Sequence, residues 1–217
     1  MQLFKSAQRV RKERSAASSS RELQGVQFLM SRAQSRNSRR AGGAILAFTS
    51  ANPGEGVSHV VQFFATKLAT QTGKPTLVVN AEQLGNLRYS DLMDMHGVAK
   101  TGVASGNGNG NGNGNGKVLD HERLRELESE TGLDLLLGLR PALGYTLIDC
   151  PPLSASPEAA LLAPEVDGVV LVVEADRTKR DQIFRARQTI EMAHGNLMGL
   201  VLNKRRHVVP EWVFRRL

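Results

Sequence analysis

The chain has 217 residues, of which 41% are hydrophobic and 5% aromatic, with one cysteine and a formal net charge of +7. This length allows one domain with a sizeable core plus tails, and a single cysteine excludes an intrachain disulfide framework. No apolar run reaches the roughly 18 residues of a membrane span, and the first residues lack the apolar core of a secretion signal. We therefore expect a cytoplasmic protein.

The positive charge is concentrated in the first 40 residues. They hold ten lysines and arginines against two glutamates, a net charge of +8, so the other 177 residues carry a net charge of −1. We interpret residues 1–40 as a basic arm with a short helix at 22–32, followed by a domain at 41–217. The arm is suited to an anionic membrane, which would place the protein at the inner face of the plasma membrane, or to a solvated tail. It lacks interleaved aromatic side chains for base stacking, so nucleic acid is not favoured as a partner.

The domain is organised around a strand, a small-residue loop and a helix. Residues 44–48 form a short apolar run that predicts a buried parallel strand. A helix that ends at Gly73 is predicted by apolar residues at spacings of three and four: Val57, Val60, Val61, Phe64 and Leu68. Strand, loop and helix in this order are typical of a phosphate-binding site.

The loop itself has the glycines of a phosphate-binding loop but not its lysine. Gly54 and Gly56 let backbone N–H groups converge on an anion at the start of the helix. The usual motif continues with a lysine for the outer phosphates and a Ser or Thr that ligates Mg²⁺. This chain has Val57 and then Ser58, and Ala51 stands in place of the first glycine. A tight strand-to-helix turn without a ligand is the alternative.

Further apolar runs predict four more strands, at residues 75–80, 145–150, 167–175 and 197–204. Helical patterns at residues 89–95, 120–130 and 180–193 lie between them. The predicted fold class is therefore α/β, a doubly wound, mostly parallel sheet flanked by helices. Residues 133–143 are apolar throughout and compatible with a strand or a helix. Residues 106–116 alternate Gly and Asn and predict a flexible linker, because they offer no apolar side chain to bury.

Polar side chains follow two of these strands at the ends where ligands bind in parallel sheets. Asn80 and Glu82 follow the second strand, and Asp149 ends the third. A carboxylate in such a place can hold a Mg²⁺-bound water beside phosphates. Asp149 and Glu82 are therefore candidate catalytic residues, and Asp149 and Ser58 are candidate metal ligands. A carboxylate that caps its own loop is the alternative for Asp149, and Cys150 is interpreted as a buried structural thiol rather than a redox sensor.

Five segments in this order resemble the bacterial tyrosine kinases of capsule and exopolysaccharide export, relatives of the septum-site and plasmid-partition ATPases. The segments are Pro53-Gly54-Glu55-Gly56-x-Ser58, the strand that ends at residue 80, residues 147–152, residues 161–169 and residues 201–203. The resemblance covers roughly residues 22–217 and implies a P-loop NTPase-like fold. It also implies that ATP and Mg²⁺ are cofactors and that a membrane polysaccharide co-polymerase, or its cytoplasmic tail, is the partner. The nucleotide-binding residues that it implies are Pro53, Gly54, Glu55, Gly56, Val57, Ser58, His59 and Asn203.

The chain departs from the family's pattern where the chemistry is expected. Val57 replaces the loop lysine, Asn80 replaces an aspartate, and Glu82 replaces a further aspartate. The oligomer motif Glu-x-x-Arg-x-x-Arg corresponds to Glu22, Gly25 and Phe28. The last residues, 210–217, contain no tyrosine, whereas family members autophosphorylate a tyrosine-rich tail.

These departures favour a pseudokinase that acts as an adaptor in exopolysaccharide export and binds ATP·Mg²⁺ weakly. The first alternative is an active ATP-binding kinase in which Lys74, Arg177, Lys179 or a neighbouring subunit replaces the missing lysine. The second is a partition-like ATPase that uses the basic arm on membrane or nucleic acid.

Overall fold

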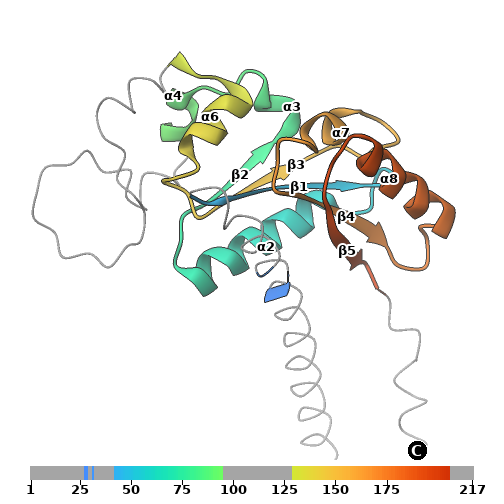
Figure 1. Ribbon diagram of the computed structural model, residues 1–217. Coiled ribbons are helices and arrows are strands. Elements are labelled where there is room, and N and C mark those ends of the chain that lie inside the picture. Colours follow the sequence, from blue (N-terminus) through green and yellow to red (C-terminus); the bar gives the residue numbers. More distant parts are fainter. Residues whose placement is uncertain (1–26, 29–30, 32–41, 95–128, 206–217) are drawn as a thin grey trace, which may run out of the picture.

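The computed structural model describes residues 27, 28, 31, 42–94 and 129–205 (Figure 1). Of the predicted helix at 22–32, Gln27, Phe28 and Ser31 are described and are helical. The Gly-Asn run at 106–116, nearly all of the predicted helix at 120–130 and the segment 210–217 lie outside the described residues. The basic arm at 1–40 lies outside them too, apart from those three residues. Along the described residues, the strands and helices follow one another in this order: β1 (Ala44–Ser50), α2 (Val57–Thr72), β2 (Thr76–Asn80), α3 (Ala81–Leu84), α4 (Tyr89–Asp94), α6 (Gly132–Leu139), β3 (Tyr145–Asp149), α7 (Glu158–Leu162), β4 (Gly168–Glu174), α8 (Arg180–Met192) and β5 (Leu197–Asn203).

The strands form one five-stranded sheet in the order β2-β3-β1-β4-β5, and every pairing between them is parallel. The predicted fold class is therefore confirmed. All seven residues of β1 are buried, because this strand lies between β3 and β4 and both of its faces are covered. β5 forms an edge of the sheet, where Leu200 and Leu202 are exposed.

Helices cover both faces of the sheet (Figure 1). The side chains of α2 pack with Leu46 and Phe48 of β1 on one face. Those of α3, α6 and α7, with Ile190 of α8, pack with Ile45 and Ala47 on the other face. Successive residues of a strand point to opposite faces, so the apolar run of β1 supplies both cores.

Helix α2 has the predicted start and end. It begins directly after Gly56, and the residues that it buries are those of the predicted apolar face together with Ala65. Gly73 ends the helix in the left-handed conformation at φ 63°, and its N–H donates to the carbonyl of Ala69. The start, the end and the buried face of α2 therefore follow from the local sequence.

The ambiguous segment at 133–143 begins as helix α6. Its Leu135, Leu136 and Leu139 are buried in the core on the face of the sheet opposite α2. A short apolar run on a covered surface does not show by itself whether it is a strand or a helix. The short helices α3 and α7 were not predicted. None of the helices in the described ranges is long and apolar enough to cross a membrane.

A buried ion pair ties α6 to the amino end of β4. The Nη1 atom of Arg140 donates to both carboxylate oxygens of Asp167 at 2.9 Å, and both side chains are nearly inaccessible to solvent. Asp167 also accepts a hydrogen bond from the Ile45 N–H at 2.8 Å. The pair therefore links three segments at the end of the sheet opposite the phosphate loop.

Candidate functional site

The loop between β1 and α2 contains two glycines in the left-handed backbone region. Gly54 and Gly56 have φ values of 80° and 90°, in the left-handed region that favours glycine. A Cβ atom at Gly56 would also displace Nδ2 of Asn203, the group that donates to the loop carbonyls. Both glycines are thus required by the geometry of the loop.

The N–H groups at the start of α2 are available to a ligand. Within the described part of the chain, no protein group accepts a hydrogen bond from the N–H groups of residues 55–58. A helix leaves its first N–H groups without intrahelical partners, and its dipole favours an anion there. Ser58 and His59, both predicted to line the site, are exposed on the first turn of α2.

The side chain of Glu55 stabilises the loop and does not point toward a ligand. Its carboxylate is buried and folds back onto the loop, where it accepts hydrogen bonds from the N–H groups of Ala51 at 3.0 Å and Asn52 at 3.3 Å. It also accepts from Asn52 Nδ2 at 3.0 Å and from the hydroxyl of Thr178. The carboxylate closes the loop, and the predicted contact of Glu55 with nucleotide depends on its backbone N–H.

The connection between β4 and α8 and the first turn of α8 support the loop from one side. Besides the contact of Thr178 with Glu55, Gln182 Nε2 donates to Asn52 Oδ1 at 3.0 Å. The Glu174 N–H donates to the Thr178 hydroxyl at 3.0 Å, which fixes the position of that hydroxyl. The sequence analysis did not predict Thr178 or Gln182. Their position after a buried strand could have indicated that they lie near the site.

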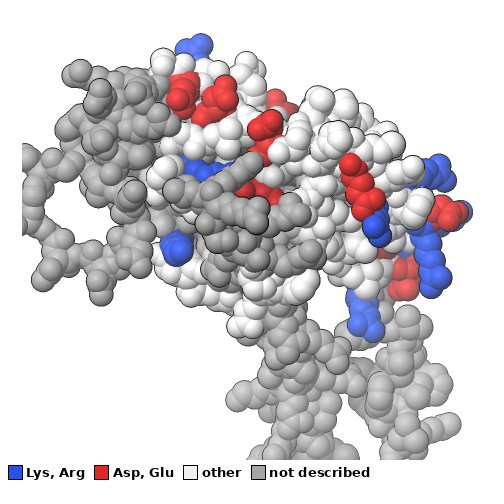
Figure 2. All heavy atoms as spheres, viewed as in Figure 1, with Lys and Arg blue, Asp and Glu red and all other residues white. Residues whose placement is uncertain are grey.

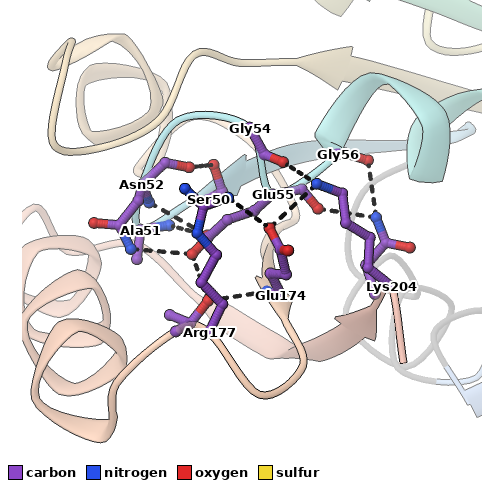
Figure 3. Close-up of polar contacts among 11 residues, drawn as sticks. Ser50, Ala51, Asn52, Gly54, Glu55, Gly56, Glu174, Arg177 and Lys204 are labelled. Atoms are coloured by element: carbon purple, nitrogen blue, oxygen red, sulfur yellow. Dashed lines mark hydrogen bonds and ion pairs between the residues drawn. The ribbon is translucent and has the colours of Figure 1, made fainter. Parts of the chain in front are cut away.

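The end of β5 supports the loop from another side (Figure 3). Asn203 Nδ2 donates to the carbonyl of Glu55 at 2.9 Å, and Lys204 Nζ donates to the carbonyl of Gly54. Lys204 also pairs with Glu174 Oε2 at 3.2 Å. This hydrogen bond from Lys204 is the main reason why the pKa of Glu174 lies below its usual range.

The cations that were considered as substitutes for the loop lysine are placed very differently. Lys74 packs against Gly144 at the amino ends of the strands, so it lies at the wrong end of the sheet. Lys179 caps the start of α8, and its N–H donates to Gln182. Arg177 is exposed and pairs with Glu174 at 3.3 Å. Among the lysines of the described residues, Lys204, which was not predicted, contacts the loop.

The side chain of Val57, at the lysine position, belongs to the core beneath α2. It is 8% exposed and packs in the same cluster as Phe48, Val61 and Phe64. The apolar periodicity of α2 thus starts at this residue. At the position where the family's pattern predicts a lysine, the side chain therefore makes an apolar core contact and carries no charge.

The strand-end candidates lie at the same edge of the sheet as the loop. Asp149 is half-buried and stands beside Phe48 of β1 on one side and Asn80 of β2 on the other. Asn80 Oδ1 accepts from the N–H of Glu82 at 2.9 Å and caps α3, while Glu82 itself is exposed. Their catalytic and metal-binding roles, and that of Ser58, stay predictions.

Cys150, next to Asp149, is 3% exposed. Burial, followed by the charges of Asp149 and Glu158, raises the pKa of its thiol to about 12. At pH 8 the thiol is therefore neutral and inaccessible. We expect the native protein to give no reaction with a thiol-exchange reagent over an hour, and the protein in denaturant to react fully within minutes. Stoichiometric labelling of native protein would contradict this interpretation of Cys150 as a structural thiol.

No model of a protein family matches the chain. The tyrosine-protein kinase CpsD of Streptococcus agalactiae is 30% identical over 175 residues, which are 74% of this chain and 75% of that protein. The succinoglycan biosynthesis transport protein ExoP of Rhizobium meliloti is 28% identical over 74% of this chain, but this covers only 22% of that protein. The solved BceF tyrosine kinase domain has a TM-score of 0.52 at 22% identity, covers 83% of this chain and 73% of that one, and supports the fold.

Proposed function

This chain belongs to the bacterial tyrosine-protein kinases of capsule and exopolysaccharide biosynthesis, and we propose that it is a degenerate member, an adaptor that binds nucleotide but transfers no phosphate. The observation that carries the proposal is the burial of Val57. A side chain that is 8% exposed in the core beneath α2 brings no charge to the phosphates. Phosphoryl transfer depends on positive charge positioned at the γ-phosphate.

The geometry supports weak binding of ATP. Its phosphates would lie against the N–H groups of residues 55–58, with Pro53 and Gly54 beside them and Asn203 on the base side. Ser58 and Asp149 would hold Mg²⁺, which neutralises phosphate charge when it is bound. Loss of the lysine removes a charge-assisted contact worth about 1.5 to 3 kcal/mol, or about ten- to a hundredfold in affinity.

The groups around this site are poorly suited to kinase chemistry. Asn80 is not a base, and its side-chain oxygen caps α3. The tyrosines in the sequence are Tyr89 and Tyr145. Tyr145 is 3% exposed at the start of β3, so the folded protein does not present it as a phosphate acceptor. The Glu55 carboxylate closes the loop and Glu174 pairs with Lys204, so in the described part of the chain the strand-end carboxylates left for chemistry are Asp149 and the exposed Glu82.

As its partner we propose a membrane polysaccharide co-polymerase or the cytoplasmic tail of such a protein. The basic residues at 1–40 would add contact with anionic lipid and place the protein at the inner face of the plasma membrane. On the face drawn in Figure 2, acidic and basic side chains of the described residues are interspersed around α8. This mixture favours neither nucleic acid nor lipid, so we assign the electrostatic contact to the arm.

A Mg²⁺·ATP titration of the purified full chain tests the proposal. We expect no binding in the submicromolar range and no phosphotyrosine in residues 210–217 after incubation with labelled ATP, because residue 57 brings no charge and this segment contains no tyrosine. Submicromolar binding together with labelled tyrosine would favour the active kinase instead.

A complementation experiment separates an adaptor from an enzyme in the cell. In a strain without the gene, we expect the Ser58→Ala variant to restore polysaccharide export as well as the unaltered gene does. An enzyme that needs Mg²⁺ at Ser58 would lose export in this variant. A partition-like ATPase would leave polysaccharide export unaffected by the deletion itself.

A further inference from the structure

The end of β5 holds the carbonyl side of the phosphate loop. Lys204 Nζ donates to the carbonyl of Gly54, while Asn203 Nδ2 donates to the carbonyl of Glu55 at 2.9 Å and lies 3.5 Å from that of Gly56 (Figure 3). Three successive carbonyl groups are therefore held by two adjacent residues.

The orientation of these carbonyls determines where the loop N–H groups point. In a trans peptide the C=O and the N–H of the same unit point in opposite directions. Carbonyls turned toward β5 therefore turn the N–H groups of Glu55, Gly56 and Val57 away from β5. These belong to the set of N–H groups for which the described residues provide no acceptor.

We infer that Lys204 is a positioning residue for a phosphate ligand and supplies, from behind the loop, part of the positive charge that the missing loop lysine would supply in front. A cation on the Gly54 carbonyl fixes this peptide and polarises it, so that its N–H becomes a better donor to an anion. This role rests on the nucleotide binding proposed above. Lys204 would make such binding feasible although residue 57 is a valine.

The charges around the loop support this role. Glu55 is buried in the loop and Glu174 lies next to it, so two carboxylates surround a site meant for an anion. Arg177 is exposed and contacts Glu174, whereas Lys204 reaches both Glu174 and the loop. Lys204 has a φ of 54°, a left-handed conformation that is unfavourable for a residue with a side chain. Strained residues of this kind persist where the surrounding contacts hold them.

The position of Lys204 also explains why binding and catalysis can be separated. Its ammonium group acts on the carbonyl side of the loop, whereas the transferred phosphate would lie on the N–H side. Lys204 therefore stabilises bound phosphates through the backbone, and it does not replace a cation at the γ-phosphate.

Calorimetric titrations of the full chain with tripolyphosphate and with Mg²⁺·ATP test the inference. We expect Lys204→Met to weaken both ligands about tenfold, the effect of losing one charge-assisted hydrogen bond. Lys204→Arg should recover most of this loss, which a purely steric role of the side chain would not predict. Lys74→Met is the matched control, because it removes the same charge at the other end of the sheet, and its affinities should stay within about twofold.

Amide hydrogen exchange of residues 51–52, whose N–H groups donate to the Glu55 carboxylate, provides a second readout in the ligand-free protein. Lys204→Met should exchange faster in this segment, and Lys74→Met should not. If the unaltered chain binds phosphate and Lys204→Met binds it equally well, the inference is overturned but the proposed function is not. If the unaltered chain binds neither ligand, the proposed nucleotide site fails together with the role of Lys204 toward phosphate, and faster exchange would then support only its hold on the loop.

Discussion

Replacing Arg140 with methionine should lower the free energy of unfolding by about 3–5 kcal/mol, because it leaves the Asp167 carboxylate buried without its cation. Both side chains of this pair are almost fully buried, and Asp167 would keep the N–H of Ile45 as a donor. For a chain of this size the melting temperature should fall by about 6–20 °C. Thermal and urea unfolding of the purified variant measure the effect.

Two further variants make this test specific. Arg187 forms an exposed pair with Glu191 at 2.7 Å, so Arg187→Met should cost less than about 1 kcal/mol. Adding Asp167→Asn to Arg140→Met should recover more than half of the lost stability, since the amide is neutral and its oxygen still accepts from Ile45 N. An Arg140→Met protein as stable as the Arg187→Met protein would show that the buried pair contributes little.

Introducing lysine at Val57 should tighten Mg²⁺·ATP binding about ten- to a hundredfold, the range expected for one charge-assisted contact. The same change removes an apolar side chain from the cluster beneath α2, so some stability should be lost. Val57→Met is the matched control, because it offers similar length without charge and should leave the affinity unchanged. Equal gains from lysine and methionine would mean that charge is not what the loop lacks.

Turnover should require a second change. Val57→Lys alone should bind ATP without hydrolysing it, whereas Val57→Lys with Asn80→Asp should hydrolyse ATP slowly, because a carboxylate then joins Asp149 at the neighbouring strand end. Both positions act on one ligand, so their effects should be non-additive. Steady-state hydrolysis of the parent, both single variants and the double variant measures this. A parent rate of about 1 s⁻¹ or more, typical of kinases, would rule out the pseudokinase.

The contacts around the loop do not depend on a lysine at position 57. Glu55, Thr178 and Asn203 hold the loop by contacts that do not involve position 57. The loop geometry is thus maintained by its neighbours, and a valine at 57 is compatible with it. This separation of loop support from phosphate chemistry makes an adaptor with a preserved nucleotide fold physically reasonable.

The sequence by itself determined the elements whose signals are local. The spacing of apolar residues and the position of Gly73 predicted α2 closely, and five apolar runs predicted the five strands, because buried parallel strands and amphipathic helices each leave a periodic pattern. It also placed the glycine loop and Asp149 at one edge of the sheet, since carboxyl ends of parallel strands coincide.

Only the tertiary structure decided which side chains complete the site. Thr178 and Glu55 are 123 residues apart, and Lys204 and Gly54 are 150 residues apart. No local pattern reports such contacts, so Lys74 was one of the predicted substitute cations although it lies at the opposite end of the strands. The helical state of α6 was decided in the same way, because its apolar segment satisfies either periodicity until the surface that it covers is known.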